Sequence, residues 1–227
     1  VIDVRSPGEF NHAQIPGAYP LPLFSDEERK IVGTTYKQQS REAAIKIGLD
    51  FFGPKMKGMV EEVEAIIGNR QKAINNKAQL PIANCVLVHC WRGGMRSGAV
   101  AWLLDMYGFK VYTLAGGYKA FRNWVLKQFS KEYNLKILGG YTGSGKTLIL
   151  QEFKSKCYPV IDLENIANHK GSAFGAIGEK PQPTQEMFEN LLALKLTEAG
   201  SKKNEVRKES ENLTYYFLPN TSAIWIE

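Results

Sequence analysis

The sequence predicts an α/β protein built on parallel sheets, and three observations support this fold class. Short apolar strands alternate with amphipathic helical stretches along the chain, as in a parallel sheet covered by helices. Two predicted strand–helix junctions carry glycine-rich loops, at Cys90–Ser97 and Gly139–Gly145. The alternation starts afresh after residues 130–134, so we expect one domain over residues 1–130 and a second over residues 134–227.

In the first domain, buried strands are predicted where apolar and β-branched residues cluster, at Val1–Val4, Cys85–His89 and Lys110–Leu114. Prolines and glycines predict a loop after the first strand. A capping box at Ser25–Glu28 predicts the start of a helix that runs through Ile47. Further helices are predicted over Met59–Ile67, Ser97–Tyr107 (ending at Gly108) and Tyr118–Phe129, with a polar loop over Asn69–Pro81.

The second domain repeats the pattern with its own strands and helices. Strands are predicted at Leu135–Leu138, Tyr158–Ile161 and Ser222–Ile226, and helices at Lys146–Lys154 and Gln185–Thr197, with a charged surface stretch over Gly200–Asn212. The chain lacks an initiator Met and ends at Glu227 within an apolar run. We therefore expect a piece of a longer protein, with a C-terminally truncated second domain.

Composition and charge narrow the class of protein. Apolar residues make up 44% of the 227 residues, and no apolar run approaches the roughly 20 residues that would span a bilayer. No signal peptide is visible, so a cytoplasmic protein without a membrane partner is expected. Residues 1–133 hold 18 Lys and Arg against 12 Asp and Glu, and residues 134–227 hold 11 against 11. The basic excess of the first domain suits nucleic acid, although a solvated basic surface would look the same.

The three cysteines are too few for a disulfide framework. Cys85 and Cys157 fit small buried cysteines. Cys90 differs, because it ends a predicted strand and precedes two glycines and two arginines. In a reducing compartment such a cysteine is more often catalytic than structural, so we predict that Cys90 is the nucleophile.

The loop after Cys90 has the composition of an anion cradle. Backbone N–H groups of a loop and of a helix N-terminus converge on an anion, and they lower the pKa of a thiolate placed among them. The predicted oxyanion loop is Trp91, Arg92, Gly93, Gly94 and Met95. Arg96 is the predicted second catalytic residue, because its planar fork can hold two oxygens of a tetrahedral anion. His89 is expected to pack or orient rather than to act as a base.

A set of short runs around this loop resembles the rhodanese family. These runs are Asp3-Val4-Arg5 with Pro7 and Glu9, Ile15–Ala18, Cys90–Ser97 and Leu114–Tyr118. The resemblance implies a cysteine that carries sulfur or selenium. The loop is longer than in many single-domain sulfurtransferases, and His89–Ser97 also fits the phosphatase pattern His-Cys-five-Arg-Ser. A wider loop suits a tetrahedral, phosphate-like group.

A second motif predicts phosphate binding in the second domain. Gly140–Thr147 satisfies G-x-x-x-x-G-K-[ST], with a strand before it and a helix after it, as in P-loop NTPases. The predicted phosphate-binding residues are Gly140, Gly143, Ser144, Gly145, Lys146 and Thr147. Asp162 and Glu227 each end a predicted strand. Either could be the acidic partner of a P-loop ligand, or a solvated carboxylate.

A rhodanese-like domain followed by a P-loop domain resembles the tRNA 2-selenouridine synthase family. The likeness extends through Ser25–Lys30, Ser40–Lys46, Cys90–Ser97, Gly140–Thr147, Asp162–Glu164, Ala167–Gly175 and Pro181–Gln185. The resemblance implies a transferase that replaces sulfur by selenium at the 2-position of a wobble uridine in tRNA. It implies selenophosphate and geranyl diphosphate as co-substrates, with Mg²⁺ as an optional companion of the P-loop ligand and no other metal.

Several alternatives remain open at this point. A Cys-dependent phosphatase or a sulfurtransferase, each with a nucleotide-binding P-loop module, would also use both loops, as would a P-loop NTPase with an accessory rhodanese domain. The P-loop ligand could be ATP, geranyl diphosphate or a tRNA phosphate. Candidates for contacts to the tRNA backbone are basic residues of the first domain, namely Arg41, Lys46, Lys55, Lys57 and Arg92.

Overall fold

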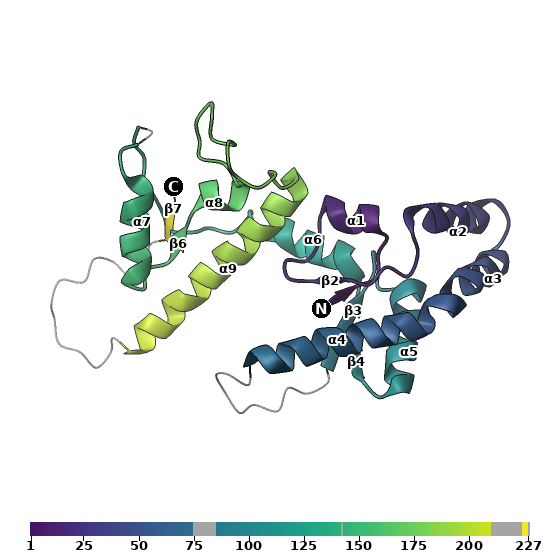
Figure 1. Cartoon of the computed structure of the whole chain (residues 1–227). Coiled ribbons are helices and arrows are strands. Elements are labelled where there is room, and N and C mark those ends of the chain that lie inside the picture. The colour runs from purple at the N-terminus through teal and green to yellow at the C-terminus, as the bar shows by residue number, and fades with distance from the viewer. Residues whose placement is uncertain (75–84, 142, 210–223, 227) are drawn as a thin grey trace. The chain divides into compact units, whose positions relative to one another are not determined.

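The computed structural model describes residues 1–74, 85–141, 143–209 and 224–226. Contacts divide the chain into two compact units, Val1–Phe121 and Arg122–Glu227 (Figure 1). The division lies inside helix α6 (Gly117–Gln128), and the predicted boundary at residues 130–134 lies just beyond the end of that helix. Each unit has its own parallel sheet, so the predicted α/β fold class is confirmed.

The sheet of the first unit has four parallel strands in the order β2-β1-β3-β4. Its strands are β1 (Ile2–Asp3), β2 (Tyr19–Pro20), β3 (Cys85–His89) and β4 (Lys110–Thr113). Strand β2 was not predicted, because its exposed residues lack an apolar pattern. Since parallel strands end at the same edge, Asp3 and His89 lie side by side where Cys90 follows.

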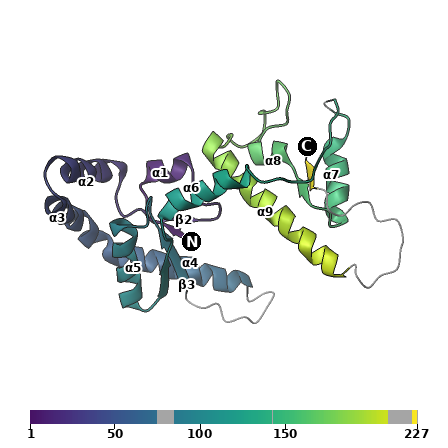
Figure 2. The same cartoon turned by 180° about the vertical axis from the view of Figure 1, so that it is seen from behind.

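Among the described residues, five helices lie between these strands in the chain and α6 follows the last strand; two of the five, those directly after β2, lie to one side of the sheet (Figure 2). The five helices are α1 (Pro7–His12), α2 (Asp26–Gln38), α3 (Arg41–Phe52), α4 (Met56–Ile74) and α5 (Met95–Tyr107), and a 3-10 turn spans Gly53–Lys55. The predicted helix ends at Ser25 and at Gly108 are confirmed. The Ser25 hydroxyl accepts from the Glu28 amide at 3.2 Å, and Gly108 has a φ of +114°.

Three predictions for these helices were wrong. Residues after β1, predicted as a loop, form α1, because Pro7 is tolerated in a first turn and Glu9 completes a capping box with Ser6. The single helix predicted through Ile47 is two helices, because the Ser40 hydroxyl accepts from the Ala43 amide at 3.1 Å and caps α3. Helix α4 continues into the polar stretch that we predicted as a loop; residues 75–81 of that stretch lie outside the described residues.

The core of the first unit is apolar and encloses one ion pair. Val4, Val88 and Val100 are fully buried in a cluster that also contains the Cys90 side chain. Arg5 and Asp3 are buried as well, with Nη2 2.6 Å from Oδ2. Arg5 also donates to the Ala13 carbonyl at 2.8 Å and lies over the Tyr118 ring. These contacts compensate for the burial of both charges and tie α1 to the sheet.

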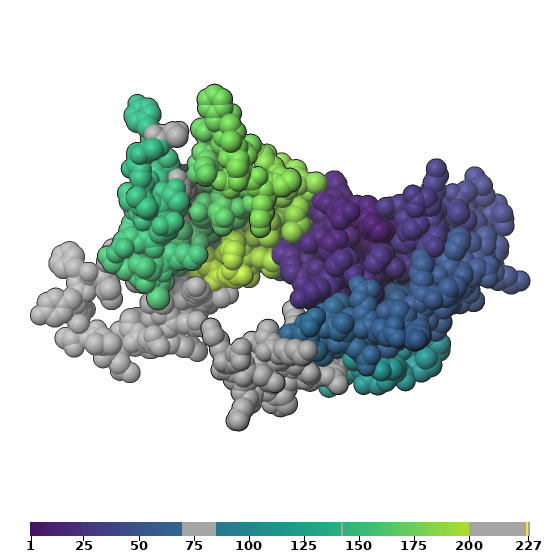
Figure 3. Space-filling model, viewed as in Figure 1, coloured from purple at the N-terminus to yellow at the C-terminus, as the bar shows by residue number. Residues whose placement is uncertain are grey.

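The second unit has a three-stranded parallel sheet in the order β5-β7-β6. Its further elements are β5 (Leu135–Ile137), α7 (Lys146–Ser155), β6 (Val160–Ile161), α8 (Leu163–Ala167), α9 (Gln185–Glu209) and β7 (Ile224–Ile226). The short helix α8 was not predicted, and the stretch from Gly200 that we predicted as charged surface is helical through Glu209. Figure 3 shows the loop before α7 and the loop before α9 as two projections of this unit.

Two cysteines lie where we did not expect them. Cys85 is exposed, because it begins β3 beyond the point where β1 pairs, at Val88 and His89. Cys157 is exposed in a turn after α7, with a φ of +62°. The prediction that both are buried was therefore wrong. Within the described ranges, no helix is long and apolar enough to cross a membrane.

Candidate active site

The Cys90 loop is fixed by backbone contacts from both sides. Strand β3 delivers Cys90 to the carboxyl edge of the sheet, and α5 begins at Met95. The Tyr118 amide donates to the Cys90 carbonyl at 2.9 Å, so the start of α6 braces the loop. A Cβ on Gly117 would lie 2.3 Å from the Cys90 carbonyl oxygen and 2.5 Å from the Gly93 amide nitrogen. Only glycine allows this approach.

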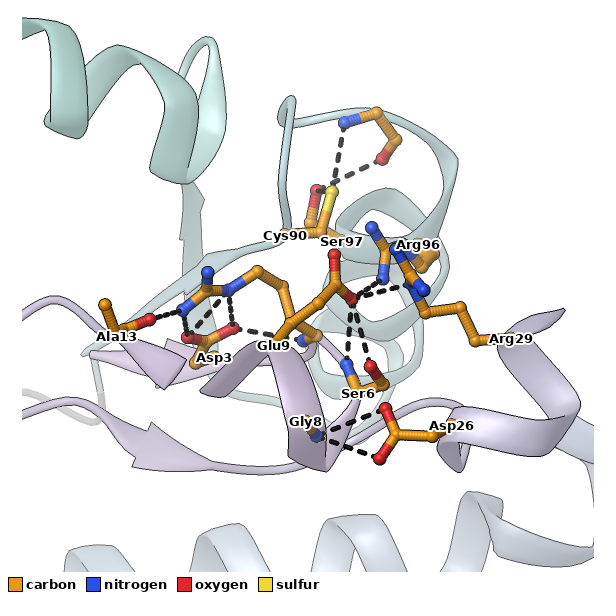
Figure 4. Close-up of polar contacts among 12 residues, drawn as sticks. Asp3, Ser6, Gly8, Glu9, Ala13, Asp26, Arg29, Cys90, Arg96 and Ser97 are labelled. Carbon is orange, nitrogen blue, oxygen red and sulfur yellow. Dashed lines mark hydrogen bonds and ion pairs between the residues drawn. The ribbon is translucent and has the colours of Figure 1, made fainter. Parts of the chain in front are cut away.

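The Cys90 sulfur lies among hydrogen-bond donors, as Figure 4 shows. The Gly94 amide donates to Sγ at 3.4 Å, and the Ser97 hydroxyl lies 3.3 Å from Sγ. Burial alone would raise the pKa of the Cys90 thiol, but hydrogen bonds from Ser97, Gly94 and Arg92 outweigh it and lower the pKa below its ordinary value. The arrangement therefore favours the thiolate, which is the nucleophilic form.

A large cavity reaches this sulfur. Cys90 is only 3% exposed, yet it lines a cavity of about 790 Å³ in the first unit. Apolar residues of α3, including Ala44 and Phe52, form part of the wall, and cationic residues form another part. The thiolate is thus shielded from bulk solvent but is accessible to a ligand in the cavity.

The Arg96 side chain is held by an ion pair with Glu9. Its Nη1 donates to Oε2 of Glu9 at 2.8 Å, and Arg29 of α2 forms an ion pair with the same oxygen, with Nε 3.0 Å away (Figure 4). Ser6 adds two more donors to that oxygen. Burial would raise the pKa of Glu9, but the hydrogen bond and charge of Arg96, with Ser6 and Arg29, lower it. Glu9 supports the resemblance to the rhodanese family but was not predicted as a site residue. The Ser-x-x-Glu capping box of Ser6 and Glu9 was the local sequence pattern that marked it.

The other residues of the predicted oxyanion loop contribute mainly through the backbone. Trp91, Arg92 and Met95 are exposed and line the cavity, and Gly93 adopts a φ of +66° that turns the loop. Trp91 lies against Tyr118, with ring centroids 5.6 Å apart. Amides therefore surround the sulfur, whereas the side chains face the cavity.

His89 is a packing residue rather than a candidate base. It is completely buried, and its Nε2 lies 3.7 Å from Asp3 Oδ2. Burial lowers the pKa of His89, against the opposing charge of Asp3, so the ring is held neutral. Within the described residues, neither ring nitrogen has a hydrogen-bond partner.

The P-loop has the strand–loop–helix geometry that its motif predicts. Gly143 and Gly145 adopt φ values of +81° and +80°, and α7 starts at Lys146. A Cβ on Gly140 would lie 2.8 Å from Ser144 Oγ, which is the end of a side chain and not part of the backbone. Lys146 Nζ donates to the Tyr141 carbonyl at 3.3 Å, and the Thr147 side chain is exposed. The described residues of the loop thus have the backbone conformation that the motif predicts.

Of the two residues predicted as acidic partners of a P-loop ligand, the structure describes one. Asp162 caps α8, with Oδ1 accepting from the Asn165 amide at 2.8 Å. Asp162 thus follows β6 and acts as the N-cap of α8, and this hydrogen bond uses only one of its two carboxylate oxygens. Glu227 lies outside the described residues. Among the described residues, no group of three or more His, Cys, Asp or Glu could hold a metal ion.

The two units match two family models. Residues 1–123 match the rhodanese-like domain, and residues 133–222 match the domain described as the tRNA 2-selenouridine synthase AAA domain. The first match covers more than half of the chain, so the chain belongs to the rhodanese-like family.

Individual relatives make the comparison more specific. The chain is 38% identical over 244 residues to tRNA 2-selenouridine synthase of Nitrosomonas europaea, with 100% of this chain and 59% of the relative covered. It is 44% identical to the synthase of Bdellovibrio bacteriovorus, with 85% and 48% covered, and 41% identical to that of a Sulfurovum species, with 86% and 50% covered. The predicted resemblance to tRNA 2-selenouridine synthases is confirmed, and the chain spans about half to three fifths of the length of these curated relatives.

Among solved structures, the chain is similar to the N-terminal domain of a Clostridium difficile 630 protein described as ATP/GTP binding. The identity is 38%, the match covers 55% of this chain and 87% of the other, and the TM-score is 0.48.

Proposed function

We propose that the protein of which this chain is a part replaces sulfur by selenium at the 2-position of the wobble 2-thiouridine in tRNA. The names of the relatives support the reaction class. The observation that carries the proposal is a buried cysteine that lies among hydrogen-bond donors and lines a cavity with cationic residues. Selenophosphate is the proposed selenium donor.

The first proposed step activates the base. The 2-thio sulfur attacks C1 of geranyl diphosphate, the S–C bond forms, the C–O bond breaks and diphosphate leaves. Gly140, Lys146 and Thr147 would hold the diphosphate group, since the open glycine loop and the exposed hydroxyl fit such a ligand. A Mg²⁺ ion would be held by Thr147 together with the diphosphate oxygens, whose charge it would neutralise.

In the second proposed step the Cys90 thiolate adds to C2 of the alkylated base. The C2–S bond to the geranyl thiolate breaks, and that group leaves as a thiol. Selenium of selenophosphate then displaces Cys90 from C2, and water takes the phosphoryl group as phosphate. Arg96 and the loop amides would bind the phosphoryl oxygens. Direct attack of Cys90 on selenium is the less favoured route, because it would expel phosphite and change the oxidation state of selenium.

The test uses the full-length protein and tRNA that contains 2-thiouridine. Nucleosides are analysed by mass spectrometry after incubation with selenophosphate, with and without geranyl diphosphate. We expect 2-selenouridine from the wild type and a loss of about a thousandfold or more in the Cys90→Ser variant, with tRNA binding retained. Cys85→Ser is the matched control, because Cys85 is exposed in the same strand.

Two outcomes would overturn this proposal. Selenation that survives in Cys90→Ser would remove the nucleophile from the mechanism. Rapid turnover of an aryl phosphate, without any selenated nucleoside, would favour the phosphatase that the pattern His89–Ser97 also fits.

A further inference from the structure

The cavity above Cys90 carries more positive charge than a single small anion needs. Five cationic residues line it, Arg29, Lys30 and Lys37 from α2 and Arg92 and Arg96 from the Cys90 loop and α5. Among the described residues that line the cavity, none is acidic. The cavity therefore selects for an anionic ligand.

Most of this charge is not neutralised by the protein. Arg29 and Arg96 share the carboxylate of Glu9. The side chains of Lys30, Lys37 and Arg92 make no ion pair or hydrogen bond within the part of the chain that the structure describes. An external anion is the partner that these three side chains lack.

The basic residues that we predicted from the sequence are placed differently. Lys55 pairs with Glu28, and Lys57 pairs with Glu61 at 3.5 Å. Arg41 and Lys46 are exposed on α3 but do not line the cavity. Of the predicted set, only Arg92 lines the cavity, and the α2 cations were missed.

The spacing of the α2 cations indicates an extended ligand. Lys30 and Lys37 are seven residues apart on one helix, which separates their Cα atoms by about 10 Å along its axis. A ligand that carries several separated charges can pair with both lysines at once. Successive phosphates of a nucleic-acid strand present charges spread in this way.

Aromatic side chains complete the site. Trp91 is 38% exposed and Tyr36 is 52% exposed, and both line the cavity. Exposed aromatic faces beside cations are the way in which proteins hold unpaired bases of RNA loops. The apolar residues of α3, such as Ile45 and Leu49, offer a wall for the edges of the base and sugar.

We propose that this cavity receives a single unpaired nucleotide of the tRNA loop, with its base against Trp91 above Cys90 and its flanking phosphates along Lys30 and Lys37. The inference rests on the proposed function in one respect, that the reacting atom belongs to a nucleobase. A bound nucleotide would account for a wide cavity with cationic residues in its wall, although the Cys90 side chain itself is buried.

The test measures binding and shielding rather than catalysis. A fluorescent anticodon stem-loop RNA containing 2-thiouridine is titrated into full-length protein at several salt concentrations, and alkylation of Cys90 by iodoacetamide is followed by peptide mass spectrometry. The test variant is Lys30→Glu with Lys37→Glu. The matched control is Arg41→Glu with Lys46→Glu, which makes the same change in net charge on the neighbouring helix.

We expect the α2 variant to bind at least about tenfold more weakly than the control, with the slope of log K against log salt reduced by about 1.4, because each single-strand phosphate contact contributes about 0.7. The RNA should slow alkylation of Cys90 in the wild type and in the control, but not in the α2 variant. Trp91→Ala should weaken binding by about tenfold, from the loss of base stacking.

Equal losses in the two double variants would overturn the inference, as would RNA that binds without shielding Cys90. Shielding by inorganic phosphate alone, at the concentration of RNA phosphate, would assign the cavity to a small anion instead. Failure of the proposed function looks different: the RNA would still shield Cys90, but no selenated nucleoside would form.

Discussion

The two glycine-rich loops of this chain have the same strand–loop–helix plan but opposite degrees of closure. In the Cys90 loop, an added Cβ on Gly93 would lie 2.5 Å from the Leu114 carbonyl oxygen, and one on Gly117 would meet three loop atoms. In the P-loop, a Cβ on Gly143 or Gly145 would meet nothing within 4 Å. The first loop is packed and the second is open.

The difference in packing fits the source of the anion that each loop would bind, which is a side chain of the protein in one loop and a ligand in the other. The Cys90 loop carries its own, a thiolate that accepts from Gly94 and Ser97, so its geometry can be set by internal contacts. In the proposed function the P-loop admits an external phosphate group, and the open space at Gly143 and Gly145 leaves room for that group. The Cys90 loop and the P-loop therefore have similar sequence patterns but different proposed roles. The first holds a nucleophile that belongs to the protein, and the second holds a ligand.

Paired glycine substitutions should show the difference in closure most strongly. Gly117→Ala should lower the free energy of unfolding of the first unit by about 3 kcal/mol or more, since it combines a clash with a left-handed backbone. Gly143→Ala has only the backbone cost and should lower the stability of the second unit by about 1 kcal/mol. Chemical denaturation measures both; equal effects would contradict the contrast.

Removal of the P-loop cation should affect one loop only. Lys146→Ala should weaken diphosphate binding by about ten- to a hundredfold, the effect of losing a charged hydrogen bond. The alkylation rate of Cys90 should stay unchanged. Lys154→Ala, an exposed lysine near the end of α7, is the control in calorimetric titration with geranyl diphosphate. A similar loss in the control would show a nonspecific effect of charge.

Ser97 should matter to the thiolate more than to the fold. Ser97→Ala removes the hydroxyl that lies 3.3 Å from Sγ and 3.1 Å from the Gly94 carbonyl oxygen, and with it a donor available to the thiolate, so the pKa of Cys90 should rise toward its ordinary value. Stability should fall by about 1 kcal/mol. The pH dependence of alkylation reports the pKa, and an unchanged profile would assign the lowered pKa to the amides alone.

The smallest expected effect concerns Glu9. Glu9→Gln removes the charge that Arg96 and Arg29 share, and it should cost about 1 kcal/mol of stability near neutral pH. Because the pKa of Glu9 is lowered on folding, this stabilisation is present above the ordinary carboxyl pKa and is lost as pH falls through the lowered one. The stabilities of wild type and variant should therefore converge in acid; a gap that stays constant with pH would contradict this.

Local motifs predicted both loops well, because strand, glycines and helix start are adjacent in the chain. The position of a residue within the sheet was harder to predict. The residues around Cys85 suggest burial, yet Cys85 is exposed because it lies in β3 beyond the two residues that pair with β1. The end of the last helix was also misplaced, since it was predicted at Thr197 and α9 continues to Glu209.

Contacts between distant segments could not be predicted. Glu9 and Arg96 are 87 residues apart, and no pattern in the sequence pairs them. The same holds for Lys30 and Lys37, whose role depends on which face of α2 borders the cavity. Periodicity identifies a helix, whereas the packing of α2 against α3 decides what each face meets.

The central claim is that hydrogen-bond donors around the Cys90 sulfur stabilise its thiolate. Alkylation by iodoacetamide, followed from pH 5 to 10 with peptide mass spectrometry, tests it with Cys85 and Cys157 as internal references, since both are exposed. We predict that the midpoint for Cys90 lies below the ordinary cysteine pKa and below both references. A midpoint equal to or above those of Cys85 and Cys157 would contradict the account.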